Sequence, residues 1–115
     1  MQKADAVLKE IEKLAEKEFL PIIGPEKGKI LKKFLEKKKP KNVLEIGTLI
    51  GYSAILLAKN LPKSSKVISI EINPRFAQIA RENIRRAGFE NVEVIVGDAK
   101  KVIPILKEKF DFVLI

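Results

Sequence analysis

Three carboxylate side chains hold equivalent places in this chain, each at or beside the end of a short apolar run. Glu45 lies inside the first run, Glu71 directly follows the second, and Asp98 follows the third after one glycine. The carboxyl ends of parallel strands meet at one edge of a sheet, so we expect these acids to lie near one another. Carboxylates there suit a ligand with hydroxyls, amines and positive charge rather than a pyrophosphate.

A loop bounded by Gly47 and Gly51 separates the first apolar run from a helix that starts near Tyr52. Such a junction admits ligand atoms close to the backbone and presents unpaired N–H groups. The pattern therefore predicts a nucleotide-like ligand at this loop. It lacks the third glycine of Gly-x-Gly-x-x-Gly, and Gly51 is not followed by the lysine of a Walker loop, so both phosphate-binding interpretations are disfavoured.

Hydrophobic periodicity predicts the elements that must position these residues. Strands are expected at 42–46, 66–70, 92–96 and 111–115. Helices are expected at about 4–18, 26–38, 52–60 and 74–87, with a short one through 102–106. Strands that alternate with helices at this spacing predict an α/β fold with a parallel sheet and crossover helices.

The two N-terminal helices are amphipathic. We expect Phe19 to continue the buried stripe of the first, and a face of Ile30, Leu31, Phe34 and Leu35 to be buried on the second. The lysines of the second helix are interpreted as a solvated face, because no aromatic residues interleave with them to stack bases. The apolar loop 21–25 either packs against the core or lines a ligand.

The composition excludes several classes of function. The chain has 115 residues, a net charge of +8, and neither cysteine nor histidine, so disulfides, thiolate zinc sites and imidazole chemistry are excluded. It has no apolar run of the ~20 residues that span a bilayer and no secretory signal at its start. We therefore expect one domain, a cytoplasmic location and no membrane partner.

Three motifs together carry a family resemblance. They are Val-Leu-Glu-Ile-Gly-Thr-x-x-Gly-Tyr-Ser at 43–53, Glu-x-Asn-Pro at 71–74 and Gly-Asp-Ala at 97–99, supported by the segment 24–31. Over roughly residues 20–115 the chain resembles class I S-adenosylmethionine-dependent methyltransferases, most closely the catechol and caffeoyl-CoA O-methyltransferases. The resemblance implies a Rossmann-like parallel sheet of order 3-2-1-4, with helices on both faces, truncated after strand four.

The resemblance also implies an S-adenosylmethionine site. Its expected residues are Ile23, Gly24, Glu45, Gly47, Thr48, Gly51, Tyr52, Ser53, Glu71, Ile72, Asp98 and Ala99. Gly47 would let the methionine part pass close to the backbone, while Ser53 and the helix-start amides would hold its carboxylate. Glu45 would favour its cationic amino end, and Ile23 with Gly24 would close over that side.

On the nucleoside side, the resemblance implies that Glu71 takes the ribose hydroxyls and that Ile72 flanks the adenine. Asp98 and the Ala99 amide would address the exocyclic amine and a ring nitrogen. Helix N-capping or solvation is the alternative role for Glu71 and Asp98.

The implied function is S-adenosylmethionine-dependent methyl transfer, with a small-molecule hydroxyl as acceptor and this chain as the cofactor-binding half. We expect one incomplete domain over 1–115, helical to about residue 40 and Rossmann-like from about 41. In the resembled family an acid at the end of strand four binds a divalent metal such as Mg²⁺. This chain ends at Ile115, so no metal ligand or catalytic residue is assigned.

Strand four would form an open sheet edge, which raises two hypotheses: a truncated longer methyltransferase, or a short chain that dimerises through this strand. Two other functions stay open. The charge of +8 is compatible with an RNA (tRNA) or protein methyltransferase, and the chain could instead be a non-catalytic cofactor-binding or interaction module.

Overall fold

The computed structural model describes residues 3–115, and residues 1 and 2 of the expected domain lie outside this range. The helices are α1 (Lys3–Glu18), α2 (Gly24–Lys38), α3 (Tyr52–Lys59), α4 (Pro74–Ala87) and α5 (Ala99–Val102), which continues into the 3-10 turn η1 (Ile103–Ile105). The strands are β1 (Asn42–Ile46), β2 (Lys66–Glu71), β3 (Val92–Val96) and β4 (Phe112–Leu114). The expected alternation of strands and helices is confirmed.

The four strands form one parallel sheet in the order β3-β2-β1-β4, as the family resemblance implied. In its register Glu45 of β1 stands beside Ser69 of β2, and Glu71 at the end of β2 stands beside Val96 of β3. The strand ends that carry the predicted acids therefore share one edge of the sheet.

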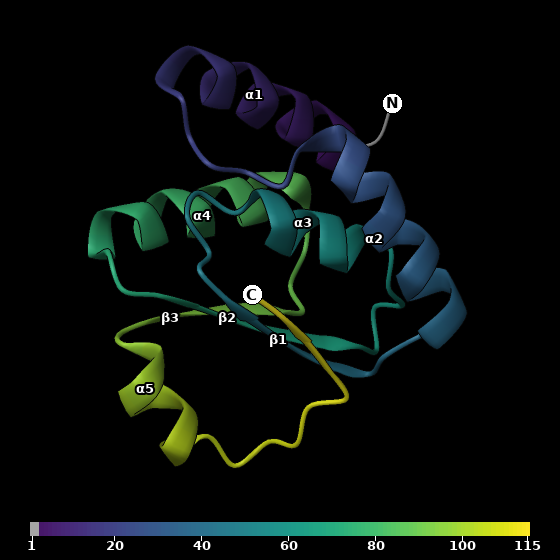
Figure 1. Ribbon diagram of the computed structural model, residues 1–115, viewed down its shortest axis with the longest axis vertical. Coiled ribbons are helices and arrows are strands. Elements are labelled where there is room, and N and C mark those ends of the chain that lie inside the picture. Colours follow the sequence, from purple (N-terminus) through teal and green to yellow (C-terminus); the bar gives the residue numbers. More distant parts are fainter. Residues whose placement is uncertain (1–2) are drawn as a thin grey trace.

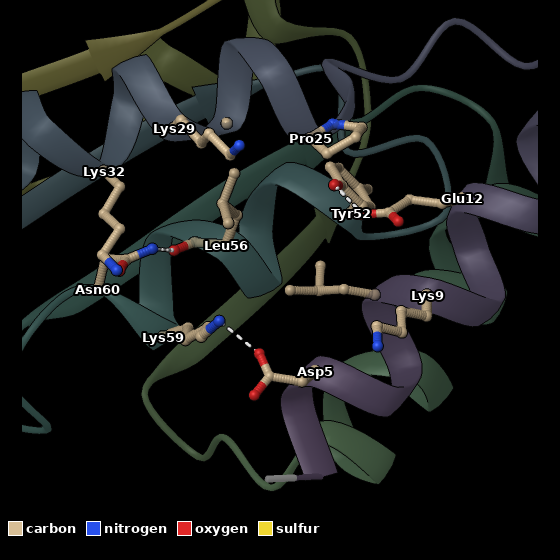
Figure 2. Close-up of a pocket in the computed structure, with 12 residues that line it drawn as sticks. Asp5, Lys9, Glu12, Pro25, Lys29, Lys32, Tyr52, Leu56, Lys59 and Asn60 are labelled. Carbon is tan, nitrogen blue, oxygen red and sulfur yellow. Dashed lines mark hydrogen bonds and ion pairs between the residues drawn. The ribbon is translucent and has the colours of Figure 1, made fainter. Parts of the chain in front are cut away.

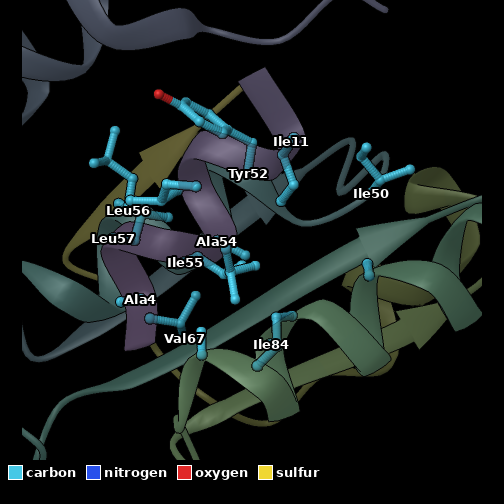
Figure 3. Close-up of a cluster of buried hydrophobic side chains, with 14 of the residues drawn as sticks. Ala4, Ile11, Ile50, Tyr52, Ala54, Ile55, Leu56, Leu57, Val67 and Ile84 are labelled. Atoms are coloured by element: carbon cyan, nitrogen blue, oxygen red, sulfur yellow. The ribbon is translucent and has the colours of Figure 1, made fainter. Parts of the chain in front are cut away.

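Helices cover both faces of the sheet, unequally. Figure 1 shows α3 and α4 above the strands, α1 lying across these two helices, and α5 below the sheet. The larger core lies on the α3 and α4 side, where Ile55 and Leu57 of α3 and Val67 of β2 are almost completely buried (Figure 3). A smaller cluster around Leu44 and Ile68 packs against α5 on the opposite face.

Two expectations about the N-terminal helices are wrong. Phe19 is 91% exposed because α1 ends at Glu18, and the positive φ of Phe19 (56°) turns its side chain away from the buried stripe. On α2, Leu31 and Leu35 are buried as expected, but Ile30 is 69% exposed and Phe34 is 42% exposed.

The orientation of α2 follows from its contact with α3. Gly28 faces Leu56 so closely that a Cβ atom at Gly28 would stand 2.9 Å from a Leu56 methyl carbon. The buried row of α2 is thus Gly28, Leu31 and Leu35, at spacings of three and four residues. Ile30 turns outward, and Phe34 packs beside Phe112 with a centroid separation of 5.2 Å.

Strand β4 is an edge strand. Within the described residues it pairs with β1 and has no partner on its other side. Its position is set by Asp111, whose carboxylate accepts hydrogen bonds of 2.9 Å from the backbone N–H groups of Lys41 and Asn42. These contacts tie the start of β4 to the start of β1.

Candidate functional site

A buried carboxyl group lies at the centre of the candidate site. Glu45 is 1% exposed, and its two oxygens accept hydrogen bonds from the hydroxyls of Ser53 and Ser69, the latter at 2.6 Å. The Ser69 oxygen lies 2.5 Å from Thr48 Oγ1, which is also buried. Strand β1, strand β2, the glycine loop and helix α3 thus meet through one chain of hydrogen bonds.

Glu45 has an unusual acidity. The pKa of its carboxyl is raised from 4.5 to about 7, chiefly by burial and in smaller part by the nearby Glu71 carboxylate, against the opposing effect of the two serine hydroxyls. No cation among the described residues forms an ion pair with Glu45. The group can therefore exchange a proton near neutral pH, and a ligand cation would favour its ionised form.

The second predicted acid organises the loop. Glu71 accepts a hydrogen bond of 2.7 Å from the Leu49 backbone N–H and one of 3.0 Å from the Asn73 N–H. Asn73, rather than Glu71, caps α4 by accepting from the N–H groups of Arg75 and Phe76. Glu71 therefore fastens the glycine loop to the end of β2, which is a role that neither the ribose-binding nor the capping interpretation included.

The two glycines of the loop have different surroundings. Both have positive φ, 93° at Gly47 and 99° at Gly51, which favours glycine. A Cβ atom at Gly47 would meet nothing within 4 Å, whereas one at Gly51 would stand 3.3 Å from the backbone of Ala80. Gly47 thus leaves open space beside the backbone, and Gly51 permits close packing of the loop on α4.

A cavity of about 480 Å³ opens beside Gly47. Four of the predicted residues line it, namely Ile23, Glu45, Gly47 and Ser53. The remaining wall comes from Pro21, Ile22, Lys27, Ile46, Leu114 and Ile115. The apolar loop 21–23 therefore packs on the core and also lines this cavity.

Three other predicted residues, Ile72, Asp98 and Ala99, follow the ends of β2 and β3. The Gly97 N–H donates to the Glu71 carbonyl at 2.9 Å, which brings the ends of β2 and β3 together. Ile72 is 68% exposed. Asp98 caps α5 by accepting from the Lys100 N–H at 3.0 Å, and Ala99 packs at the start of that helix.

The structure does not bring Tyr52 and Gly24 to the cavity beside Gly47. Tyr52 is buried, and its hydroxyl donates to Glu12 of α1 at 2.5 Å, away from the sheet edge (Figure 2). Burial and then the contact with Glu12 raise the pKa of this phenol. Tyr52 instead lines a second cavity of about 420 Å³ among α1, α2 and α3, together with Lys29, Lys32 and Lys59 (Figure 2). Gly24 lines a third cavity, between α1 and the start of α2.

Two residues at the site were missed by sequence reasoning. Ser69 interrupts an otherwise apolar strand, Val67-Ile68-Ser69-Ile70, and that buried hydroxyl was a readable signal of a polar partner. Lys27 is one of several lysines on α2, and nothing in its spacing distinguished it before the fold placed it beside the cavity.

Metal ligands do not gather in this part of the molecule. Within residues 3–115 there is no group of three or more histidine, cysteine, aspartate or glutamate side chains that could hold a metal ion. The polar lining of the cavity beside Gly47 includes the buried carboxyl of Glu45 and the hydroxyl of Ser53, and an ionised carboxyl favours a cationic group on a ligand.

Comparisons with known proteins point to one family. A family model described as O-methyltransferase matches residues 2–115. A transmembrane O-methyltransferase of Propithecus coquereli is 44% identical over 95 residues, which cover 81% of this chain and 35% of that protein. A catechol O-methyltransferase of Niastella koreensis is 38% identical over 117 residues, covering 96% of this chain and 53% of that protein.

The solved structure of an O-methyltransferase from Bacillus cereus in complex with SAH is similar with a TM-score of 0.80 and 36% identity, covering 94% of this chain and 52% of that one. This chain therefore spans about a third to about half of the length of the relatives that it matches. Among residues 3–115 no helix is long and apolar enough to cross a membrane.

Proposed function

The chain belongs to the O-methyltransferase family, and on this premise we propose that it binds S-adenosylmethionine beside Gly47 and serves methyl transfer to a small-molecule hydroxyl. One observation carries the proposal. A buried carboxyl without a cationic partner among the described residues, an open glycine and an apolar loop line one cavity at the carboxyl ends of parallel strands.

In this proposal, different parts of the ligand bind at the ends of different strands. Glu45 faces the cationic amino group, and Gly47 leaves space for the chain that joins it to the sulfonium. Glu71 keeps lone pairs for the ribose hydroxyls, since each of its oxygens accepts only one hydrogen bond from the described backbone. The exposed Ile72 offers an apolar surface to the adenine, and Asp98 with Ala99 lies on the adjacent strand end.

The remaining predicted residues support the site through their positions. Thr48 extends the hydrogen-bond chain behind Glu45, and Gly51 allows the loop to pack on α4. Tyr52 and Gly24 stay predictions as ligand contacts, and each of them lines another cavity than the one beside Gly47.

The bound cofactor would supply an activated methyl group on a cationic sulfur. The residues of this chain would hold and orient that ligand, and positioning is a major source of rate in such a displacement. No residue of this chain is assigned as the base that takes the acceptor's proton, and no group of metal ligands is assigned among residues 3–115.

Calorimetric titration with S-adenosylhomocysteine tests the proposal. We expect saturable binding to the chain and a loss of at least about tenfold in affinity for Glu71→Ala, since hydrogen bonds to a charged group contribute about 1.5–3 kcal/mol each. Glu90→Ala, an exposed acid between α4 and β3, is the matched control and should bind normally. An unaltered chain that shows no binding would refute the proposal.

Three further assignments are also proposals. One domain over 1–115 is supported by a shared core that joins α1 and α2 to the sheet layer. A second copy that pairs with the free edge of β4 is supported by the exposure of Val113, and sedimentation showing only a monomer would argue against it. A cytoplasmic location rests on composition, and fractionation of the source cells would test it.

A further inference from the structure

We propose that Lys27 binds the carboxylate of the methyl donor's amino-acid end, so that the cavity recognises a zwitterion between Lys27 and Glu45. This inference rests on the proposed function, and it assigns a ligand contact to a residue to which the resemblance gave no role.

The position of Lys27 supports this role. It lies in the first turn of α2 and lines the same cavity as Glu45 of β1 and Ser53 of α3. Among the described residues Lys27 forms no ion pair or side-chain hydrogen bond, and its side chain is exposed. Its neighbours Lys29 and Lys32 line the interhelical cavity instead (Figure 2). Lys27 is thus the cation among the lining residues of the cavity beside Gly47.

The hydrogen bonding of Ser53 leaves one fewer side-chain donor for the ligand carboxylate. A serine hydroxyl has one proton to donate, and Ser53 donates it to Glu45. It therefore has no proton left for a ligand carboxylate, which is the role that the resemblance gave it. The helix-start amides that the resemblance also names remain as donors, and an ammonium at the rim would add a charge-assisted hydrogen bond.

Glu45 and Lys27 are the acidic and the basic side chain among the lining residues of the cavity. Glu45 is deeply buried and accepts only from neutral hydroxyls among the described residues, so it is short of positive charge. Lys27 lies on another element and is short of negative charge. An α-amino acid carries an ammonium and a carboxylate on one carbon, and it would supply both partners at once.

Lys27 also lies at a helix position where cations are usually disfavoured. A cation in the first turn of a helix faces the positive end of the helix dipole, where acids are preferred. A cation in the first turn of a helix is a candidate for a functional role when its side chain also lines a cavity. A bound carboxylate near this helix start would be favoured by Lys27 and by the dipole together.

A pair of ligands tests the inference. Calorimetry of the unaltered chain, Lys27→Met and the matched control Lys29→Met would use S-adenosylhomocysteine and its decarboxylated analogue, which keeps the amine and lacks only the carboxylate. We expect Lys27→Met to weaken S-adenosylhomocysteine binding by about tenfold or more and to leave the analogue unchanged or slightly tighter. Lys29→Met should bind both ligands as the unaltered chain does.

The outcomes separate this inference from the proposed function. Saturable binding that Lys27→Met leaves unchanged, or weakens equally for both ligands, overturns the role of Lys27 while the proposed function stands. Failure of the unaltered chain to bind either ligand overturns both. Thermal unfolding of each variant checks that the fold is intact, and Lys27→Arg, which keeps the charge, should recover part of the lost affinity.

Discussion

The buried carboxyl of Glu45 makes the stability of the chain depend on pH in an unusual direction. Its pKa is about 7 in the folded chain, against about 4.3–4.5 for an unperturbed glutamate. Between these values the unfolded chain releases a proton that the folded chain keeps. The free energy of unfolding therefore falls as pH rises through this window, and the Glu45 contribution is fully favourable only below the lower pKa.

The magnitude follows from the size of the shift. A difference of about 2.5 pKa units, at about 1.4 kcal/mol per unit, corresponds to about 3 kcal/mol of stability lost between pH 4.5 and pH 7. Several exposed acids, among them Asp5 and Asp111, have lowered pKa values and act in the opposite direction. They are the same in a Glu45→Gln variant, so the difference between the two proteins isolates Glu45.

Urea unfolding of the unaltered chain and of Glu45→Gln, measured from pH 4 to pH 8, tests this prediction. The glutamine amide can accept from one serine and donate to the other, and it does not titrate. We expect the stability of Glu45→Gln relative to the unaltered chain to rise by about 3 kcal/mol across the window. Parallel stability curves at all pH values would refute the reasoning about the burial of Glu45.

Three other substitutions have defined outcomes. Gly51→Ala should lose more stability than Gly88→Ala, by about 1–2 kcal/mol in thermal or urea unfolding. Both glycines have positive φ, but only at Gly51 would the added methyl group press on the backbone of Ala80. Equal losses of stability would contradict this packing. Tyr52→Phe should cost about 1 kcal/mol of stability, because it removes the hydrogen bond to Glu12. It should leave the affinity for S-adenosylhomocysteine unchanged. A tenfold weaker affinity would instead indicate that Tyr52 contacts the ligand. Asp111→Asn should lose about 1 kcal/mol of stability above pH 5, because a donating amide NH2 replaces one of the two carboxylate oxygens that accept from the Lys41 and Asn42 N–H groups. Since the pKa of Asp111 is lowered in the folded chain, this difference should fade as pH falls below about 3.8. A difference that grows in acid would be the contrary result.

Local signals were enough to predict the elements and the sheet edge. Asn73-Pro74 and Gly88 bound α4 as the sequence predicted, since an N-cap side chain, a proline in the first turn and a glycine stop act within a few residues. The order of the strands came from the family resemblance. The pairing of Glu45 with Ser69 was not predicted, because it depends on the register between two strands that are distant in sequence.

Side-chain orientation depended on contacts between distant segments and was predicted less well. The outward turn of Ile30 is set by the contact of Gly28 with Leu56 of α3, which the periodicity of α2 does not contain. Tyr52 follows directly after the glycine loop, but its contact with Glu12 depends on how α1 lies across α3. The attachment of Glu71 to the Leu49 N–H required the loop conformation itself.

The most direct test of the central claim is a heteronuclear NMR titration of the isotope-labelled chain with S-adenosylhomocysteine. The account predicts saturable shift changes that centre on the amides of 47–53, 71–73 and 97–99. No saturable change, or changes centred on the interhelical cavity lined by Lys29, Lys32 and Lys59, would contradict it.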